Sequence, residues 1–159
     1  MFRMMCLLEL VVLMFVGVVS AAAYSELDVA KMVPYVRKAK DMKGYSSSVV
    51  VEDILRIARI DPTAITDEQL REAVAIIATR EWIDGHYVGA TLSAVTDQVT
   101  EKIFKLEGEL YKMYPEKTKD YYEAAHAAFI EIAPELFKHD VQRRLPKINA
   151  LRAKYVPMP

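Results

Sequence analysis

Glu123 and His126 have the spacing of a metal-binding helix. Three residues apart, they place a carboxylate and an imidazole on one helical face, as in di-iron bundles. Such centres need two E-x-x-H motifs and two more carboxylates, and neither His86 nor His139 follows a glutamate by three residues. We therefore interpret Glu123 and His126 as a helix-surface pair, and we predict no metal site and no cofactor.

The residues needed for nucleophilic catalysis are scarce. The only cysteine, Cys6, lies in the N-terminal leader described below, which excludes thiol chemistry from the rest of the chain. Ser93 lacks the flanking glycines of a nucleophile elbow. Carboxylates such as Glu107 and Glu109 are numerous, but on helices they usually belong to solvated faces. The sequence therefore predicts a protein that is not an enzyme.

Cations gather near the C-terminus, where six basic residues face a single acid, Asp140. A basic amphipathic end can meet an anionic lipid or membrane surface, a fatty-acid carboxylate or an acidic protein partner; it can equally pack against its own domain. We select Arg143, Arg144 and Lys147 as candidate ligand contacts. The six basic residues are Lys138, Arg143, Arg144, Lys147, Arg152 and Lys154.

Aromatic residues crowd the second half of the chain. Tyrosine has an apolar body and a polar tip, which suits a wet-ended ligand cavity, an interface or ordinary core packing. We select Trp82, Tyr122 and Phe129 as the candidate aromatic contacts of a ligand.

The N-terminus has the pattern of an export signal. Arg3 precedes an apolar run from Leu7 to Val19, and small residues follow up to Ala23. The run is short for a membrane anchor, which needs about 20 residues. We predict a signal peptide over residues 1–23 and a secreted, extracellular domain over residues 24–159.

Composition limits what this domain can be. Hydrophobic residues make up 53% of the chain, which argues against disorder, and the net charge of −1 disfavours a nucleic-acid partner. Without a cysteine beyond the leader, the domain must be stabilised by buried helical faces and not by disulfides.

Apolar residues recur every three or four positions along nearly the whole chain. The pattern predicts an all-α fold, a single irregular bundle of six or seven amphipathic helices without disulfides. The clearest start is at Thr66, which forms a capping box with Gln69, while Ile65 and Leu70 have the spacing of a hydrophobic staple. The expected helices cover residues 28–43, 48–60, 67–84, 87–114, 118–132, 134–145 and a short stretch after Pro146.

Several boundaries depend on prolines and glycines. Pro34 suits the first turn of the first helix, and Gly44 suits its end. Pro115 is expected to end the long fourth helix, and Thr118 to cap the next one. Pro134 is expected to separate two helices.

Two segments carry a resemblance to known families. Residues 61–70 (DPTAITDEQL) and 146–155 (PKINALRAKY) resemble the loop-to-helix segments and the lysine-rich closing helix of two groups of secreted nematode proteins. These are the fatty-acid- and retinol-binding proteins and the SXP/RAL antigens. The resemblance implies a secreted carrier of fatty acids or retinoids with a cavity between its helices.

These observations together predict a secreted helical binding protein for a small hydrophobic ligand. Amphipathic helices without disulfides can part to admit an acyl chain, and pockets between helices are a common ligand location. The alternative is a secreted protein-interaction module, an effector or antigen without a small-molecule ligand. An exposed, shallow apolar surface would favour this alternative.

Overall fold

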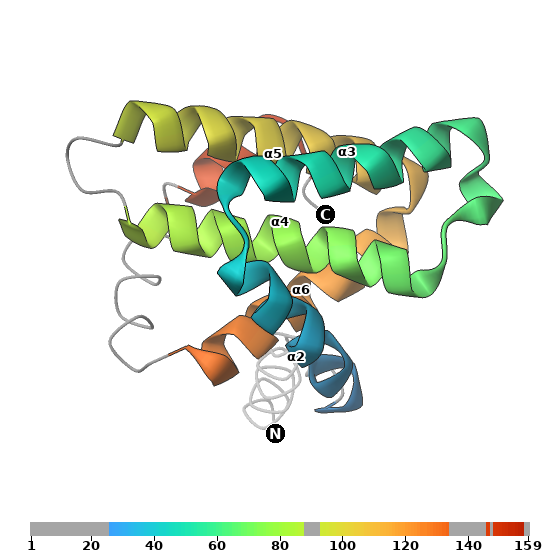
Figure 1. Cartoon of the computed structure of the whole chain (residues 1–159), viewed down its shortest axis with the longest axis horizontal. Coiled ribbons are helices and arrows are strands. Elements are labelled where there is room, and N and C mark those ends of the chain that lie inside the picture. Colours follow the sequence, from blue (N-terminus) through green and yellow to red (C-terminus); the bar gives the residue numbers. More distant parts are fainter. Residues whose placement is uncertain (1–25, 88–92, 134–145, 147, 158–159) are drawn as a thin grey trace, which may run out of the picture.

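The computed structural model describes residues 26–87, 93–133, 146 and 148–157. Within these residues the fold is all-α, as predicted, and contains no strand. Helix α4 runs through the middle of the bundle, with α3 and α5 along one side and α2 and α6 along the other (Figure 1). The helices are α2 (Glu26–Asp41), α3 (Gly44–Ile60), a 3₁₀ turn η1 (Pro62–Ala64), α4 (Asp67–Tyr87), α5 (Ser93–Met113) and α6 (Pro115–Ile132).

A short helical segment near the C-terminus, residues 148–157, packs beside α5. None of the described helices is both long and apolar enough to cross a membrane. The predicted signal peptide and the predicted helix over residues 134–145 lie outside the described residues.

The central position of α4 follows from its composition. Every residue from Ala73 to Ile83 is buried, so this helix has no solvated face along its middle. A helix that is apolar on all sides must be surrounded by others. Small alanines at positions 73, 75 and 78 let the neighbouring helices approach closely. Its neighbours are amphipathic and turn their apolar faces toward it, which makes α4 the axis of the core.

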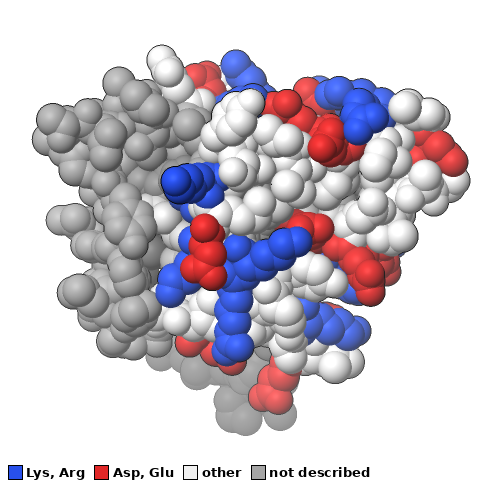
Figure 2. Space-filling model, viewed as in Figure 1, with Lys and Arg blue, Asp and Glu red and all other residues white. Residues whose placement is uncertain are grey.

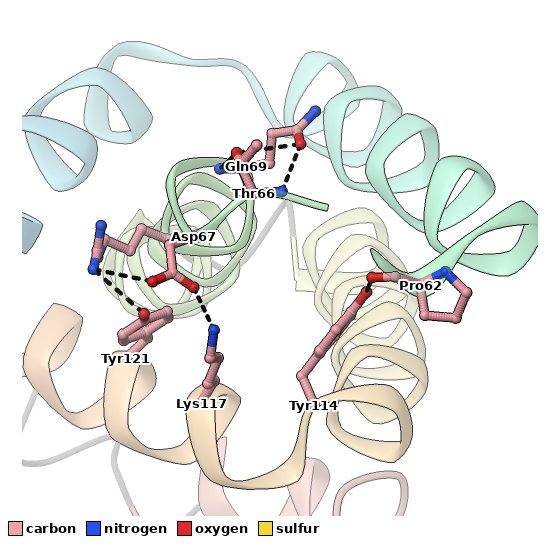
Figure 3. Close-up of polar contacts among 8 residues, drawn as sticks. Pro62, Thr66, Asp67, Gln69, Tyr114, Lys117 and Tyr121 are labelled. Atoms are coloured by element: carbon pink, nitrogen blue, oxygen red, sulfur yellow. Dashed lines mark hydrogen bonds and ion pairs between the residues drawn. The ribbon is translucent and has the colours of Figure 1, made fainter. Parts of the chain in front are cut away.

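The start of α4 is fixed by the predicted capping box (Figure 3). The backbone N–H of Thr66 donates to Gln69 Oε1 at 3.0 Å, and the N–H of Gln69 donates to Thr66 Oγ1 at 3.2 Å. The same end is tied to the start of α6, because Lys117 Nζ lies 2.5 Å from Asp67 Oδ1. The Tyr114 hydroxyl donates to the Pro62 carbonyl at 2.6 Å. These bonds set where α6 crosses α4.

Several of the predicted boundaries are wrong. Pro34 lies in the third turn of α2 and not at its start. Gly44 begins α3 instead of ending α2, so α3 starts one turn before Ser48, and both Ser47 and Ser48 are buried. The turn at Met42 is held by Arg80 of α4, which donates to the Met42 carbonyl. This long-range bond has no signature in the local sequence.

At the other boundary, Pro115 begins α6 and does not merely end α5. Its missing N–H costs nothing in the first turn of a helix. Thr118 is therefore inside α6 and not its cap. Its side chain is buried, and its backbone N–H donates to the Tyr114 carbonyl at 2.9 Å. The predicted end of this helix at Ala133 is confirmed.

The C-terminal segment contacts α5 closely at Gly108. A Cβ atom at this position would lie 2.5 Å from the Tyr155 carbonyl oxygen, which is too near for any side chain. Ile148 and Val156 are buried on either side of this contact. The Tyr155 hydroxyl donates to Glu101, two turns before Gly108 on α5. The absence of a side chain at Gly108 therefore permits the segment to dock.

Gly108→Ala tests this contact. In an exposed helix the change would stabilise by about 0.5–1 kcal/mol. Here we expect it to lower the free energy of unfolding by about 1–3 kcal/mol, because the new methyl group overlaps the Tyr155 carbonyl. Denaturant titration followed by circular dichroism measures the change. Gln98→Ala, at an exposed position of α5, is the matched control and should be close to neutral. A Gly108→Ala protein more stable than the wild type would contradict the close contact.

Candidate functional site

The middle of the bundle contains a buried carboxyl group, that of Glu81 on α4, which is fully shielded from solvent. Its Oε2 accepts a hydrogen bond of 2.6 Å from the Tyr122 hydroxyl on α6. Its other oxygen, Oε1, has no hydrogen-bond partner within the part of the chain that the structure describes. A buried polar atom left unpaired costs about 1–3 kcal/mol, so this oxygen is an unusual feature of the core.

A second buried acid, Glu107 on α5, is fully paired. Arg152 of the C-terminal segment donates to it through two nitrogens, with Nε 2.9 Å from Oε1 and 3.0 Å from Oε2. The guanidinium of Arg152 also lies over the ring of Tyr122, 4.0 Å from its centroid. Arg152 therefore connects the C-terminal segment to α5 and α6 at once.

Two buried carboxyl groups share one guanidinium in this cluster. Burial, with the Glu107 charge acting in the same direction, raises the pKa of Glu81 to about 8, against the opposing effects of Tyr122 and Arg152. Burial also raises the pKa of Glu107, although Arg152 opposes it. Glu81 is therefore largely a neutral carboxylic acid at pH 7.

Aromatic rings lie directly beside this cluster. The indole of Trp82 stacks on the imidazole of His126, with centroids 4.0 Å apart and planes 15° from parallel. Phe129 packs against the same indole at 6.1 Å. Trp82 is buried, and its Nε1 has no hydrogen-bond partner among the described residues. Burial lowers the pKa of His126, which is only partly buried and brings the ring cluster to the surface.

Three of the six predicted ligand contacts come together here. Trp82 of α4 meets Phe129 of α6, and Tyr122 lies two turns before Phe129 on the same face of α6. The other three, the cations at positions 143, 144 and 147, lie outside the described residues, and their role stays a prediction.

Sequence reasoning missed the charged half of the site. Glu107 was interpreted as part of a solvated face, but it is almost completely buried. Packing of the C-terminal cations against their own domain was one of the alternatives, and Arg152 follows it, but its partner Glu107 was not foreseen. The local signal was the run Thr79-Arg80-Glu81, which puts polar residues directly after the apolar stretch at residues 73–78. A polar run at the buried centre of a helix marks a site with long-range partners.

The E-x-x-H pair has a different setting from the one expected. His126 faces the core and stacks on Trp82, while Glu123 is partly buried. The described residues contain no group of three or more His, Cys, Asp or Glu side chains placed to hold a metal ion. The environment of His126 is therefore aromatic.

A separate hollow lies between the ends of α2 and α6. It is open and mainly polar, has a volume of about 390 Å³ and is lined by Arg37, Lys40, Asp41, Glu131 and Ile132. Acidic and basic side chains alternate over the face of the molecule shown in Figure 2. The hollow therefore differs from the closed apolar cavity expected of a carrier, and the aromatic cluster remains the candidate site.

Comparison of the chain with family models, curated proteins and solved structures finds no match. The resemblance to the two nematode families is thus untested and stays a prediction.

The raised pKa of Glu81 predicts how stability depends on pH. The folded protein keeps this proton up to about pH 8, whereas an unfolded glutamate loses it near pH 4.5. The folded state therefore binds more protons across this window, and the free energy of unfolding falls as pH rises through it. Glu81→Gln is neutral at every pH and should be more stable than the wild type at pH 8 by several kcal/mol.

Denaturant midpoints between pH 5 and 9 measure this difference. Glu68→Gln, at an exposed position of the same helix, is the matched control and should follow the wild type. A residual slope in Glu81→Gln belongs to Glu107. Parallel pH profiles for Glu81→Gln and the wild type would show that Glu81 is ionised in the folded protein.

Removing Arg152 should leave Glu107 buried without its partner. We expect Arg152→Met to lower the free energy of unfolding by about 3–5 kcal/mol. Adding Glu107→Gln should restore much of this loss, because the double variant no longer buries a charge at this pair. A double-mutant cycle in urea measures the coupling. Additive effects of the two changes would contradict the paired geometry.

Proposed function

We propose that this protein binds a small hydrophobic ligand, of fatty-acid or retinoid type, and that it acts without catalysis. The observation that carries the proposal is the cluster of Trp82, Tyr122 and Phe129 at the contact of α4 with α6. These three residues, selected from the sequence as ligand contacts, lie where α4 meets α6, next to the buried carboxyl group of Glu81. Ligand sites commonly combine an apolar lining with few polar groups in this way.

The arrangement of α6 supports the same proposal. Beyond the hydrogen bond from Tyr122 to Glu81, its contact with α4 toward Phe129 is aromatic packing, whereas the opposite end is fixed by the Lys117–Asp67 ion pair and the bond from Tyr114 to Pro62. Without disulfides, the aromatic end can separate from α4 while the tied end holds the two helices together. An apolar chain entering beside Phe129 would then bury its surface against rings already present.

We also propose that the protein is secreted after cleavage behind Ala23. This part of the proposal rests on the leader pattern alone. N-terminal sequencing of protein recovered from the medium tests it, with Tyr24 as the expected first residue.

A fluorescent acyl probe tests binding directly. Dansyl-undecanoic acid should shift its emission to the blue on mixing, saturate at one or two probes per chain and be displaced by unlabelled oleate. Trp82 supplies an internal reporter, since its emission should change as the ligand contacts its ring. We expect Phe129→Leu to weaken binding by about tenfold through the loss of apolar contact.

The matched control is Leu70→Val, a core change about 18 Å from Trp82 along the same helix. It should lower stability slightly and leave probe affinity unchanged. Equal losses of affinity in Phe129→Leu and Leu70→Val would place the probe elsewhere. Folded protein that binds no probe saturably at micromolar concentration would exclude the carrier function.

The alternative, a protein-interaction module, is favoured by one observation on α3. Tyr45 and Val49, one turn apart on this helix, are 80% and 40% exposed. Large apolar side chains exposed together are typical of contact surfaces. If no lipid binds, crosslinking to partners through this surface becomes the next experiment, with Tyr45→Ser as the variant expected to lose them.

A further inference from the structure

The unpaired oxygen of Glu81 indicates what kind of group the site could bind. Oε2 is occupied by the Tyr122 hydroxyl, while Oε1 is buried without a partner among the described residues. The Tyr122 hydroxyl has one proton, which it donates in this bond. No described residue therefore donates to Glu81 Oε1.

The charged groups around Glu81 bear on the charge of a group that could bind Oε1. From α5, Glu107 contributes a second carboxyl group; from the C-terminal segment, Arg152 contributes one guanidinium, which Glu107 binds through both oxygens. From α6, Tyr122 contributes a neutral phenol. Arg80, the neighbour of Glu81 on α4, donates to the Met42 carbonyl. No cation among the described residues therefore donates to Glu81 Oε1.

We propose that the site also binds hydrophobic ligands with a primary amine, whose ammonium group pairs with Glu81 Oε1. This inference rests on the proposed function, because the apolar chain of the ligand would occupy the aromatic cluster next to Glu81. The additional ligand class is therefore a long-chain aliphatic amine.

Binding of an amine moves one proton. Before binding, the Glu81 carboxyl is largely protonated at pH 7, and the free amine is an ammonium ion with a pKa near 10.4. On binding, the carboxyl loses its proton to solvent, and the resulting carboxylate pairs with the ammonium, which keeps all its protons. Binding therefore releases about one proton per amine at pH 7.

Ligands with other head groups would not release a proton on binding. An alcohol can hydrogen-bond to the neutral acid, but it gives no reason for the acid to ionise. A carboxylate would add a negative charge close to Glu107, so the head group of a fatty acid would have to lie away from Glu81. A preference for amines thus separates recognition by Glu81 from general lipid binding.

Dodecylamine, 1-dodecanol and dodecanoate, each below its micellar concentration, provide the test. Isothermal titration calorimetry at pH 7, in buffers with different ionisation enthalpies, gives both affinity and proton release. We expect dodecylamine to bind about 10- to 100-fold more tightly than dodecanol, as a charge-assisted hydrogen bond would predict. Only the amine should release a proton.

Glu81→Gln should remove both the amine preference and the proton release while dodecanol still binds. Glu68→Gln, exposed on the same helix, should keep both. Equal affinities for amine and alcohol, or amine binding without proton release, would overturn the inference and leave the proposed function standing. Tighter binding of dodecanoate would overturn it in favour of the predicted C-terminal cations. If none of the three compounds binds, the proposed function itself fails.

Discussion

The paired contact between Arg152 and Glu107 is the interaction on which the centre of this molecule depends. A guanidinium and a carboxylate taken out of water are stable together only if their hydrogen bonds are well formed. Here two nitrogens meet two oxygens, and the Tyr122 ring covers the guanidinium. Because Arg152 belongs to the C-terminal segment, this pair also fixes the position of that segment on α5. Gly108 allows that path by leaving room for the Tyr155 carbonyl.

The site follows from the way the helices surround α4. A helix buried on every side can present polar residues only to other helices, so Glu81 meets α6 through Tyr122 and shares its surroundings with Glu107 of α5. The neighbouring Trp82 meets His126 and Phe129 on α6. One turn of α4 thus joins an acidic group to an aromatic surface. That combination suits a ligand with an apolar body and a polar head.

The sequence was sufficient for the features that are local. The capping box at Thr66 and the end of α6 at Ala133 are where short-range patterns predict them, and the all-α fold follows from the spacing of apolar residues. Gly44 and the start of α6 were misplaced, because a glycine or proline can belong to the end of one helix or to the start of the next. Glu107 was misjudged for another reason. Its burial depends on Arg152, 45 positions later, and no helical periodicity encodes a contact at that separation.

The burial of α4 also bears on how the protein opens. The amide hydrogens from Ala73 to Ile83 are covered by neighbouring helices on all sides, so none of them is reached by fraying at a surface. Exchange with deuterated solvent at these positions requires that the bundle come apart as a whole. Hydrogen exchange of the amides of α4 therefore reports the global unfolding of the bundle. A ligand that enters beside this helix must therefore displace its neighbours, while α4 itself stays folded.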